Sequence, residues 1–235
     1  MTTQQTIKDM FLSSNIELSD EQISDFETYY NLIVEWNEKF NLTAILDLNE
    51  VVEKHFIDSL ACLNNLSEDQ KIVDIGAGAG FPSIPLAIMN RNLNFILIDS
   101  VNKKITFLKE VIKTLKLTNV VAMHARIEDI AMSDAYREKF DVCVSRAVAR
   151  LNTLVEYALP LVKIGGKVIC YKSKLVDEEV DEAKKAIKLL GGKVSDIEKF
   201  ELNSQKRALV NIDKIATTPK QYPRKNNKAR TQPIV

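Results

Sequence analysis

Cysteine, histidine, glycine and proline are all scarce in this sequence of 235 residues. The three cysteines, Cys62, Cys143 and Cys170, are odd in number, widely spaced and form no CxxC pair, so neither a disulfide framework nor a zinc-thiolate site is expected. The two histidines, His55 and His124, have no second ligand three or four residues away. No metal centre is therefore expected.

Long apolar runs are missing as well. Residues 1–11 are polar and contain no hydrophobic signal segment, and no run of about 18 apolar residues is long enough to span a membrane. With 46% hydrophobic and 27% charged residues, the chain has the composition of a globular protein that forms its own core. We expect a cytoplasmic monomer with no membrane partner.

The formal net charge is zero, which would argue against a nucleic-acid partner, but the charges are segregated along the chain. Residues 1–70 carry 3 basic and 14 acidic side chains, whereas residues 206–235 carry 8 basic side chains and 1 acidic one. A basic C-terminal segment suits the phosphates of a nucleic acid. A solvated tail without a partner explains the same charges, so charge alone leaves both interpretations open.

The N-terminal part of the chain has helical periodicity and contains neither glycine nor proline before residue 76. Ser19 is the expected N-cap of a helix, with Gln22 at the matching capping-box position. A second helix is expected over residues 49–63. We interpret residues 1–65 as a helical cap.

Apolar strands and helical stretches alternate after residue 71. The expected strands cover residues 72–75, 95–98, 120–123, 140–144 and 167–171, and the expected helices cover 84–90, 103–115, 151–161 and 177–190. Two further strands, 193–201 and 207–212, are close enough to pair as a hairpin. Strands that are apolar on both faces indicate an α/β fold, with a mostly parallel sheet and an antiparallel edge strand. We predict this domain over residues 66–216, followed by an extended basic tail over residues 217–235.

Glycines are concentrated in the segment Asp74-Ile75-Gly76-Ala77-Gly78-Ala79-Gly80, directly after the first strand of the sheet. A doubly wound sheet binds nucleoside cofactors at such a turn, because glycines allow a ligand to approach the backbone. A dinucleotide site needs G-x-G-x-x-G, and Phe81 stands where its third glycine would be. The acid Asp74 suits a cationic ligand. The loop therefore favours S-adenosylmethionine over NAD, although a tight turn without a ligand also explains the loop taken alone.

Acidic residues follow the next two strands. Asp99 ends the second strand, where a carboxylate can accept both ribose hydroxyls, and Ile127 and Glu128 follow the third, where an amide and a carboxylate can meet adenine. Taken singly, Asp99 is more often a helix N-cap and Glu128 a surface acid. In order along successive strands, they predict a cofactor site. Seven strands that end in a hairpin resemble the Rossmann-like sheet of class I S-adenosylmethionine-dependent methyltransferases.

Motifs that are absent from the sequence reduce the number of chemical groups that could accept the methyl group. No Asn/Asp-Pro-Pro-aromatic motif follows the fourth strand, which disfavours exocyclic amines. The cysteines lie in apolar strands or on a helix without a basic neighbour, which disfavours a cysteine nucleophile. An acceptor that needs no base remains, such as guanine N7, which carries no proton. Arg146, at the end of the fourth strand, could donate to guanine O6.

Several segments spread over nearly the whole chain carry a family resemblance. Residues 36–45 read WNEKFNLTAI, 55–60 read HFIDSL, 74–86 read DIGAGAGFPSIPL, 145–148 read SRAV, 171–172 read YK and 222–225 read YPRK. Together they resemble the RsmG (GidB) family of bacterial 16S ribosomal RNA guanine-N7 methyltransferases. The N-terminal and strand-four segments are the specific ones, because the glycine loop alone occurs in many families.

The resemblance implies methylation of a guanine in the 530 loop of 16S rRNA, in the small ribosomal subunit. With the loop argument, the expected cofactor contacts are Asp74, Gly76, Gly78, Phe81, Asp99, Ile127, Glu128 and Arg146. Arg146, His55 and Lys172 are expected to position the acceptor. RNA contacts are expected at Asp58, Ser59, Lys172, Arg207, Arg224 and Lys225. We expect the basic tail to bind phosphates without affecting the cofactor; core packing and an exposed strand end are the alternatives for His55 and Lys172.

Three positions depart from the family pattern. Ser83 stands where the family has glycine, Ser173 replaces a glycine after Tyr-Lys, and Asn226-Asn227 replace a Gly-x-Pro stretch. Three other functions stay open on the residues alone. They are a small-molecule methyltransferase on the same fold, an rRNA-binding assembly factor without catalysis, and an NAD oxidoreductase.

Overall fold

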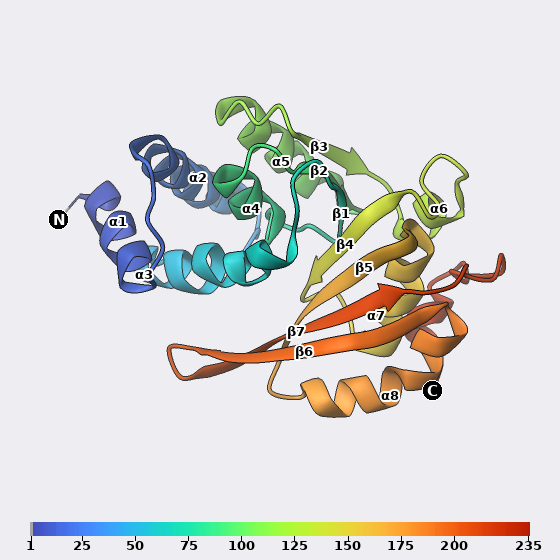
Figure 1. Cartoon of the computed structure of the whole chain (residues 1–235). Coiled ribbons are helices and arrows are strands. Elements are labelled where there is room, and N and C mark those ends of the chain that lie inside the picture. The colour runs from blue at the N-terminus through green and yellow to red at the C-terminus, as the bar shows by residue number, and fades with distance from the viewer. Residues whose placement is uncertain (1) are drawn as a thin grey trace.

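A computed structural model describes residues 2–235 (Figure 1). Residues 2–65 fold mainly as helices, as expected: α1 (Thr3–Ser13), α2 (Asp20–Lys39), α3 (Leu48–Val51), η1 (Val52–Ile57) and η2 (Leu60–Asn65). The predicted capping box is confirmed. The Ser19 hydroxyl accepts the Gln22 amide at 3.2 Å, and the Ser19 amide donates to the Gln22 side chain at 2.9 Å.

The helical run predicted over residues 49–63 is present, but it is not one regular α-helix. After α3 the chain continues as the π-helical η1 and then the 3-10 helix η2. Side chains capture two carbonyls here: Lys54 O accepts from Arg146 Nη2 at 2.5 Å, and His55 O accepts from the Ser59 hydroxyl. Carbonyls satisfied by side chains do not need the regular helical partner, and such π segments are frequent at functional sites.

A seven-stranded sheet, with the order β3-β2-β1-β4-β5-β7-β6, forms the centre of the described part of the chain. The strands are β1 (Lys71–Ile75), β2 (Asn94–Asp99), β3 (Val120–His124), β4 (Phe140–Arg146), β5 (Val162–Ser173), β6 (Gly192–Leu202) and β7 (Gln205–Lys214). Strands β1 to β5 are parallel, and β7 runs antiparallel to both β5 and β6. The predicted mostly parallel sheet is confirmed. Its antiparallel strand lies second from the edge, because the hairpin places β7 between β5 and β6.

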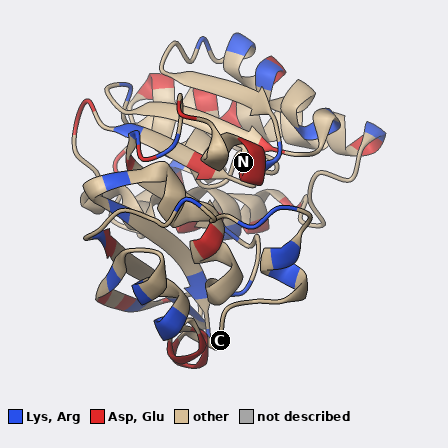
Figure 2. Ribbon diagram, turned by 90° about the vertical axis from the view of Figure 1, so that its right-hand side faces the viewer, with Lys and Arg blue, Asp and Glu red and all other residues tan. Residues whose placement is uncertain are grey.

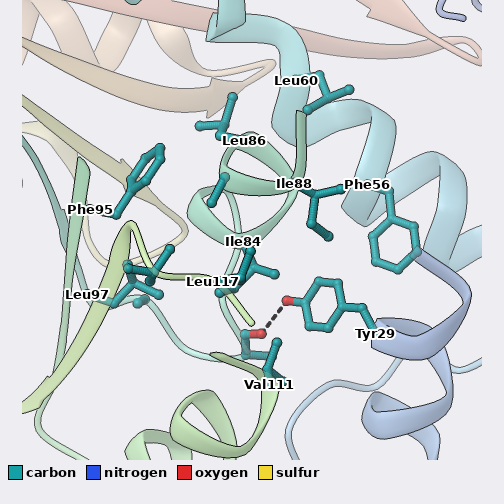
Figure 3. Close-up of a cluster of buried hydrophobic side chains, with 14 of the residues drawn as sticks. Tyr29, Phe56, Leu60, Ile84, Leu86, Ile88, Phe95, Leu97, Val111 and Leu117 are labelled. Carbon is teal, nitrogen blue, oxygen red and sulfur yellow. Dashed lines mark hydrogen bonds between the residues drawn. The ribbon is translucent and has the colours of Figure 1, made fainter. Parts of the chain in front are cut away.

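Helices cover both faces of the sheet. The cap, α4 (Ser83–Met89) and α5 (Asn102–Thr114) share one core, and α6 (Ile127–Met132), α7 (Leu151–Ala158), η3 (Leu159–Leu161) and α8 (Val176–Leu189) share the other. Figure 3 shows the first core, where Tyr29 of α2 stacks on Phe56 at 5.4 Å and donates to the Ala79 carbonyl at 2.5 Å. The cap is therefore hydrogen-bonded directly to the glycine loop.

The tail, residues 217–235, is not extended throughout, which corrects the sequence prediction. Positive φ values of 58° at Asn226 and 60° at Asn227 turn the chain into a short helix, α9 (Lys228–Thr231). Ala229 is fully buried, and its carbonyl accepts from Thr153 of α7 at 3.0 Å. The Arg137 side chain donates to three further tail carbonyls, those of Thr218, Pro219 and Tyr222. The tail is thus packed on the domain.

Candidate active site

The glycine loop, residues 74–80, takes backbone conformations that side chains disfavour. The angle φ is +71° at Gly76, +60° at Gly78 and +103° at Gly80. A Cβ atom at Gly76 or Gly80 would lie 2.5 Å or 2.6 Å from a neighbouring side chain. At Gly78 a Cβ atom would meet nothing nearer than 3.9 Å. The protein leaves free space over Gly78, and this is where a ligand can approach the backbone.

Asp99 ends β2 beside this loop and is 5% exposed. Its Oδ2 accepts the Gly78 amide at 3.0 Å, and its Oδ1 accepts the Val101 amide at 2.8 Å. The Lys104 ammonium lies 3.7 Å from Oδ2. The two amides orient the carboxylate, which keeps further acceptor capacity for the paired hydroxyls of a ribose.

Asp74 lies beneath the loop, fully buried. The Ser83 hydroxyl donates to its Oδ2 at 2.7 Å, so this departure from the family pattern has a structural use. Its Oδ1 has no hydrogen-bond partner among the described residues. Burial raises the pKa of this carboxyl to about 7, with the Ser83 hydrogen bonds opposing the shift. Asp74 is placed to respond to a cation above the loop, but it is not on the surface of the site.

Phe81 follows the loop and connects it to the cap. Its ring stacks on His55 with centroids 4.4 Å apart, and the Arg146 guanidinium lies 5.9 Å from its centroid. His55 Nε2 lies 3.0 Å from the Thr43 hydroxyl, and its Nδ1 lies 3.3 Å from Arg146 Nη2. Burial, followed by the Arg146 charge, lowers the pKa of His55 to about 4. The imidazole is therefore neutral at pH 7 and serves in packing and orientation.

Arg146 ends β4 and is held by the cap. Its guanidinium donates to Lys54 O at 2.5 Å and to the Ser59 hydroxyl at 3.5 Å, and it pairs with Asp58 Oδ2 at 3.2 Å. Asp58 is 3% exposed and also pairs with Arg207 of β7 at 3.2 Å. One carboxylate thus joins the cap, β4 and β7. The structure brings together Arg146, His55, Asp58, Ser59 and Arg207, all of which were predicted site residues.

A pocket of about 400 Å³ opens beside this cluster. Its lining includes Arg146, Arg207, Lys172 and the ring of Phe200. The side chain of Lys172 is 7% exposed, and its ammonium is held by Glu179 at 2.7 Å and by the Ala149 carbonyl at 2.8 Å. Sequence reasoning missed Phe200 and Glu179, because they come from β6 and α8, distant in the chain and outside any motif.

The residues predicted to meet adenine lie at the start of α6. Glu128 is 9% exposed, and no hydrogen bond or ion pair of its carboxylate occurs within residues 2–235. Ile127, Glu128 and Tyr157 line a small pocket of about 130 Å³. This pocket and the space over Gly78 lie at the same edge of the sheet, at the ends of β3 and β1.

The two predicted RNA contacts of the tail differ in environment. Arg224 is engaged by Glu156 of α7, with N–O distances of 2.9 Å and 2.6 Å, and Glu156 is fully buried. Lys225 is exposed and has no ion pair in the described chain. Arg224 is thus already used to hold the tail, while Lys225 is accessible to a phosphate.

Other chemistries find no support in this fold. All three cysteines are buried, and burial raises the pKa of Cys62 and Cys170 to about 12, so neither thiol is a ready nucleophile at pH 7. Within residues 2–235 no three His, Cys, Asp or Glu side chains are grouped as metal ligands. In the same residues, no helix has the length and apolarity that a membrane crossing requires.

The sheet order, the glycine loop after β1 and the acids after β2 and β3 define a Rossmann-like, class I methyltransferase fold. The chain belongs to a particular family within that class, the rRNA small subunit methyltransferase G family, whose model matches residues 22–212.

Curated relatives extend the match to nearly the whole chain. Ribosomal RNA small subunit methyltransferase G of Desulforamulus reducens is 47% identical over 233 residues, covering 97% of this chain and 97% of the relative. The protein of the same name from Staphylococcus saprophyticus is 47% identical over 224 residues, covering 94% and 93%. The predicted family is confirmed.

Solved structures share the fold at low identity. M. jannaschii TYW2, crystallised in complex with AdoMet, has a TM-score of 0.55 at 20% identity, covering 68% of this chain and 76% of its own. The [4+2]-cyclase SpnF has a TM-score of 0.58 at 12% identity, covering 80% and 95%. A cyclase on the same fold shows why the activity must be argued from the site.

Proposed function

We propose that this protein transfers a methyl group from S-adenosylmethionine to N7 of a guanine in the 530 loop of 16S ribosomal RNA. The position of Arg146 carries the proposal. Its guanidinium lies over Phe81 beside the glycine loop, and it also lines the 400 Å³ pocket. One side chain therefore borders both the cofactor site and a space for the acceptor. The curated relatives are named for the small-subunit rRNA on which they act.

The residues at the loop fit S-adenosylmethionine. The open space over Gly78 admits the ligand, Asp99 is oriented to accept ribose hydroxyls, and Glu128 is free to accept the adenine amine. Asp74 lies beneath this space with its Oδ1 unpartnered, and a cationic amine or sulfonium bound above it would favour its ionised form. When bound, S-adenosylmethionine supplies an electrophilic methyl group on its sulfonium.

The acceptor pocket offers orientation and no free base. His55 is neutral and held between Thr43 and Arg146, and Lys172 is paired with Glu179. Guanine N7 suits such a site, because it has an in-plane lone pair and no proton to remove. Transfer breaks the S–CH₃ bond and forms an N7–CH₃ bond, and the positive charge passes to the purine. Arg146 donates to guanine O6 and fixes N7 opposite the methyl group.

The aromatic ring of Phe200 and the cations around it suit a base that leaves its stack. Extruded nucleotides are held by stacking on aromatic rings, while basic side chains contact the flanking phosphates. Arg207 borders the same pocket, half-buried against Asp58. Phe200 and Arg207 also stand opposite each other in the β6–β7 pairing, so the hairpin presents both on one edge of the pocket.

Exposed lysines of the tail are the best candidates for further phosphate contacts. Lys220, Lys225 and Lys228 are exposed and make no ion pair in the described structure, and Figure 2 shows basic segments along the stretch that leads to the C-terminus. Their contribution should fall steeply with salt. We place the protein in the cytoplasm with its rRNA substrate, acting as a monomer without a metal. We propose that residues 1–65, 66–216 and 217–235 form the cap, the methyltransferase domain and the tail.

Methyl transfer from radiolabelled S-adenosylmethionine tests the proposal against its rivals. Purified protein is incubated with 30S particles lacking the modification, with naked 16S rRNA and with a panel of small phenols. Label in either RNA substrate and none in the phenols supports the proposal. Label in phenols alone indicates a small-molecule methyltransferase, and RNA binding without label indicates an assembly factor.

The tail lysines are tested separately by charge reversal. Lys220→Glu combined with Lys225→Glu should reduce RNA methylation at least fivefold at 150 mM salt, with a weaker salt dependence than wild type. Lys8→Glu with Lys39→Glu, on the acidic cap, is the matched control and should leave the rate within twofold. Equal loss in both double variants would show that net charge, not the tail, determines RNA affinity.

A further inference from the structure

The tail passes over the side of the molecule where the predicted adenine contacts lie. The pocket of about 130 Å³ lined by Ile127 and Glu128 has a second wall, made of Asn227 and Arg230. A neighbouring hollow of about 480 Å³ is bounded by Glu128 and Asp129 on one side and by residues 225–227 on the other. Residues from the middle of the domain and residues of the tail therefore enclose this space together.

Several contacts hold the tail in this position. The Ala229 carbonyl accepts from Thr153, and Arg224 is clamped by the buried Glu156. Between these anchors, the positive φ values of residues 226–227 turn the chain towards α6 and α7. The wall is thus a built part of the fold, with a fully buried residue, Ala229, at its centre.

Arg230 also reaches the glycine loop indirectly. Its Nη2 donates to the Val148 carbonyl at 3.1 Å, and the Val148 side chain occupies the place where a Cβ atom at Gly76 would lie. The tail therefore contacts the segment after β4, and that segment in turn contacts the glycine loop. A ligand in the loop and the order of the tail should influence each other.

We propose that residues 226–230 form the outer wall of the cofactor site and contact the adenosine end of S-adenosylmethionine. The inference rests on the proposed function, because it takes that cofactor as the ligand. Glu128, more than nine-tenths buried and without a partner among the described residues, is one polar wall of this space. Asn227 and Arg230 are the other.

The chemistry of the two walls is complementary to adenine. Adenine presents an amine donor and ring-nitrogen acceptors in one plane, with an exposed face on each side. The Glu128 carboxylate can only accept hydrogen bonds, whereas the Asn227 amide both donates and accepts them. Together they can bond to the adenine amine and to its ring nitrogens. The Arg230 guanidinium can lie against the ring face. The tail thereby acquires a role besides phosphate binding, which changes our sequence-based expectation that it leaves the cofactor unaffected.

Calorimetric titration of the full chain with S-adenosylhomocysteine and with adenosine tests this inference. The variants are Arg230→Met and Asn227→Gly, the latter because glycine keeps the positive φ while losing the amide. Lys228→Met, on the same short helix but outside the pocket lining, is the matched control. We expect each of the first two to weaken both ligands about tenfold by the same factor. Lys228→Met should match wild type.

The outcomes separate the alternatives. Wild-type affinity in Arg230→Met and Asn227→Gly overturns the inference. Weakened S-adenosylhomocysteine with unchanged adenosine also overturns it, because that result places the effect at the glycine loop and not at adenine. Wild type that binds neither ligand contradicts the proposed function itself. As a second readout, S-adenosylhomocysteine should slow tryptic cleavage after Lys225 and Arg230 in wild type, and unchanged cleavage counts against the wall.

Discussion

At the scale of single residues, one carboxylate organises the acceptor side of the site. Asp58 is 3% exposed and lies 3.2 Å from both Arg146 and Arg207. A buried carboxylate shared by two guanidiniums fixes both of them through charge-assisted hydrogen bonds. Asp58 therefore acts as a positioning residue for the arginines that border the pocket.

Replacing Asp58 with Asn should separate positioning from folding. Asp58→Asn keeps the shape but leaves two arginines without their anion, and we expect a loss of about 2 kcal/mol in stability. The methyl-transfer rate should fall at least tenfold, while S-adenosylhomocysteine affinity changes less than threefold. Glu35→Gln, which removes an exposed pair with Lys39, is the control and should change neither. Unchanged transfer in Asp58→Asn would remove Asp58 from the site.

Asp74 predicts a pH dependence of stability. Its pKa is about 7 in the fold and 3.8 in the unfolded chain, so folding favours the protonated form. The protonated Asp74 carboxyl makes its full contribution to the free energy of unfolding below pH 4. This contribution falls by about 1.4 kcal/mol per pH unit as the pH rises to 7. The melting temperature of wild type minus that of Asp74→Asn should fall between pH 4 and pH 7 and then level off. A difference that stays constant across this window would contradict the assignment.

Residue-scale prediction from sequence succeeds where the signal is local. Gly78 and Asp99 follow their strands directly, and the structure joins them by a 3.0 Å hydrogen bond. Glu179 and Phe200 carry no local signal, because they reach the site through packing of α8 and β6. The engagement of Arg224 by Glu156 could not be read from charge, since nothing in the sequence distinguishes a buried glutamate from a surface one.

At the scale of elements, two segments form most of the site: the glycine loop, residues 74–80, and the irregular helical segment of the cap, residues 52–59. The segment from η1 to residue 59 gives Arg146 a backbone carbonyl, a carboxylate and a hydroxyl within six residues, 54–59. Helical periodicity predicts the helix but not its π register, because that register depends on an arginine from β4. Most element types were predictable from apolar patterning. The short helix α6, the full length of β5, which covers residues 162–173 instead of 167–171, and the position of β7 in the sheet were not.

Two glycines of the loop should respond differently to alanine. Both Gly78→Ala and Gly80→Ala require a positive φ, at about 1–2 kcal/mol each. Gly80→Ala adds a clash of 2.6 Å with Ile84, for about 1–3 kcal/mol more in lost stability. Gly78→Ala meets no protein atom closely, so its main effect should be at least tenfold weaker S-adenosylhomocysteine binding. Calorimetry and thermal melts distinguish the two, and tight binding by Gly78→Ala would show that the ligand lies elsewhere.

At the scale of the whole molecule, two cores cover the two faces of the sheet, and the Asp58 ion pairs join the cap to β4 and β7. The cap contacts the sheet through one core, and the tail closes over α7 on the other face. The acidic residues 1–70 include the helical cap, and the basic residues 206–235 form most of β7 and the tail, so we expect RNA to approach from the side of the tail.

Tail docking should contribute strongly to global stability through one arginine. Arg224→Met leaves the fully buried Glu156 without its cation, and we expect a loss of about 3 kcal/mol or more in the free energy of unfolding. Lys225→Met, the adjacent exposed residue, should stay within about 0.5 kcal/mol of wild type. Denaturant unfolding measures both. Equal stability of the two variants would mean that the tail is held by other contacts.

The central claim, guanine-N7 methylation of small-subunit rRNA, is tested most directly by locating the transferred methyl group. Purified protein and deuterium-labelled S-adenosylmethionine are incubated with unmodified 30S particles and 16S rRNA, and nuclease digests are analysed by mass spectrometry. The account predicts one labelled 7-methylguanosine, in a fragment from the 530 loop, which is lost in Arg146→Ala. Label on another base, on another atom of guanine or in another region of the rRNA would contradict it.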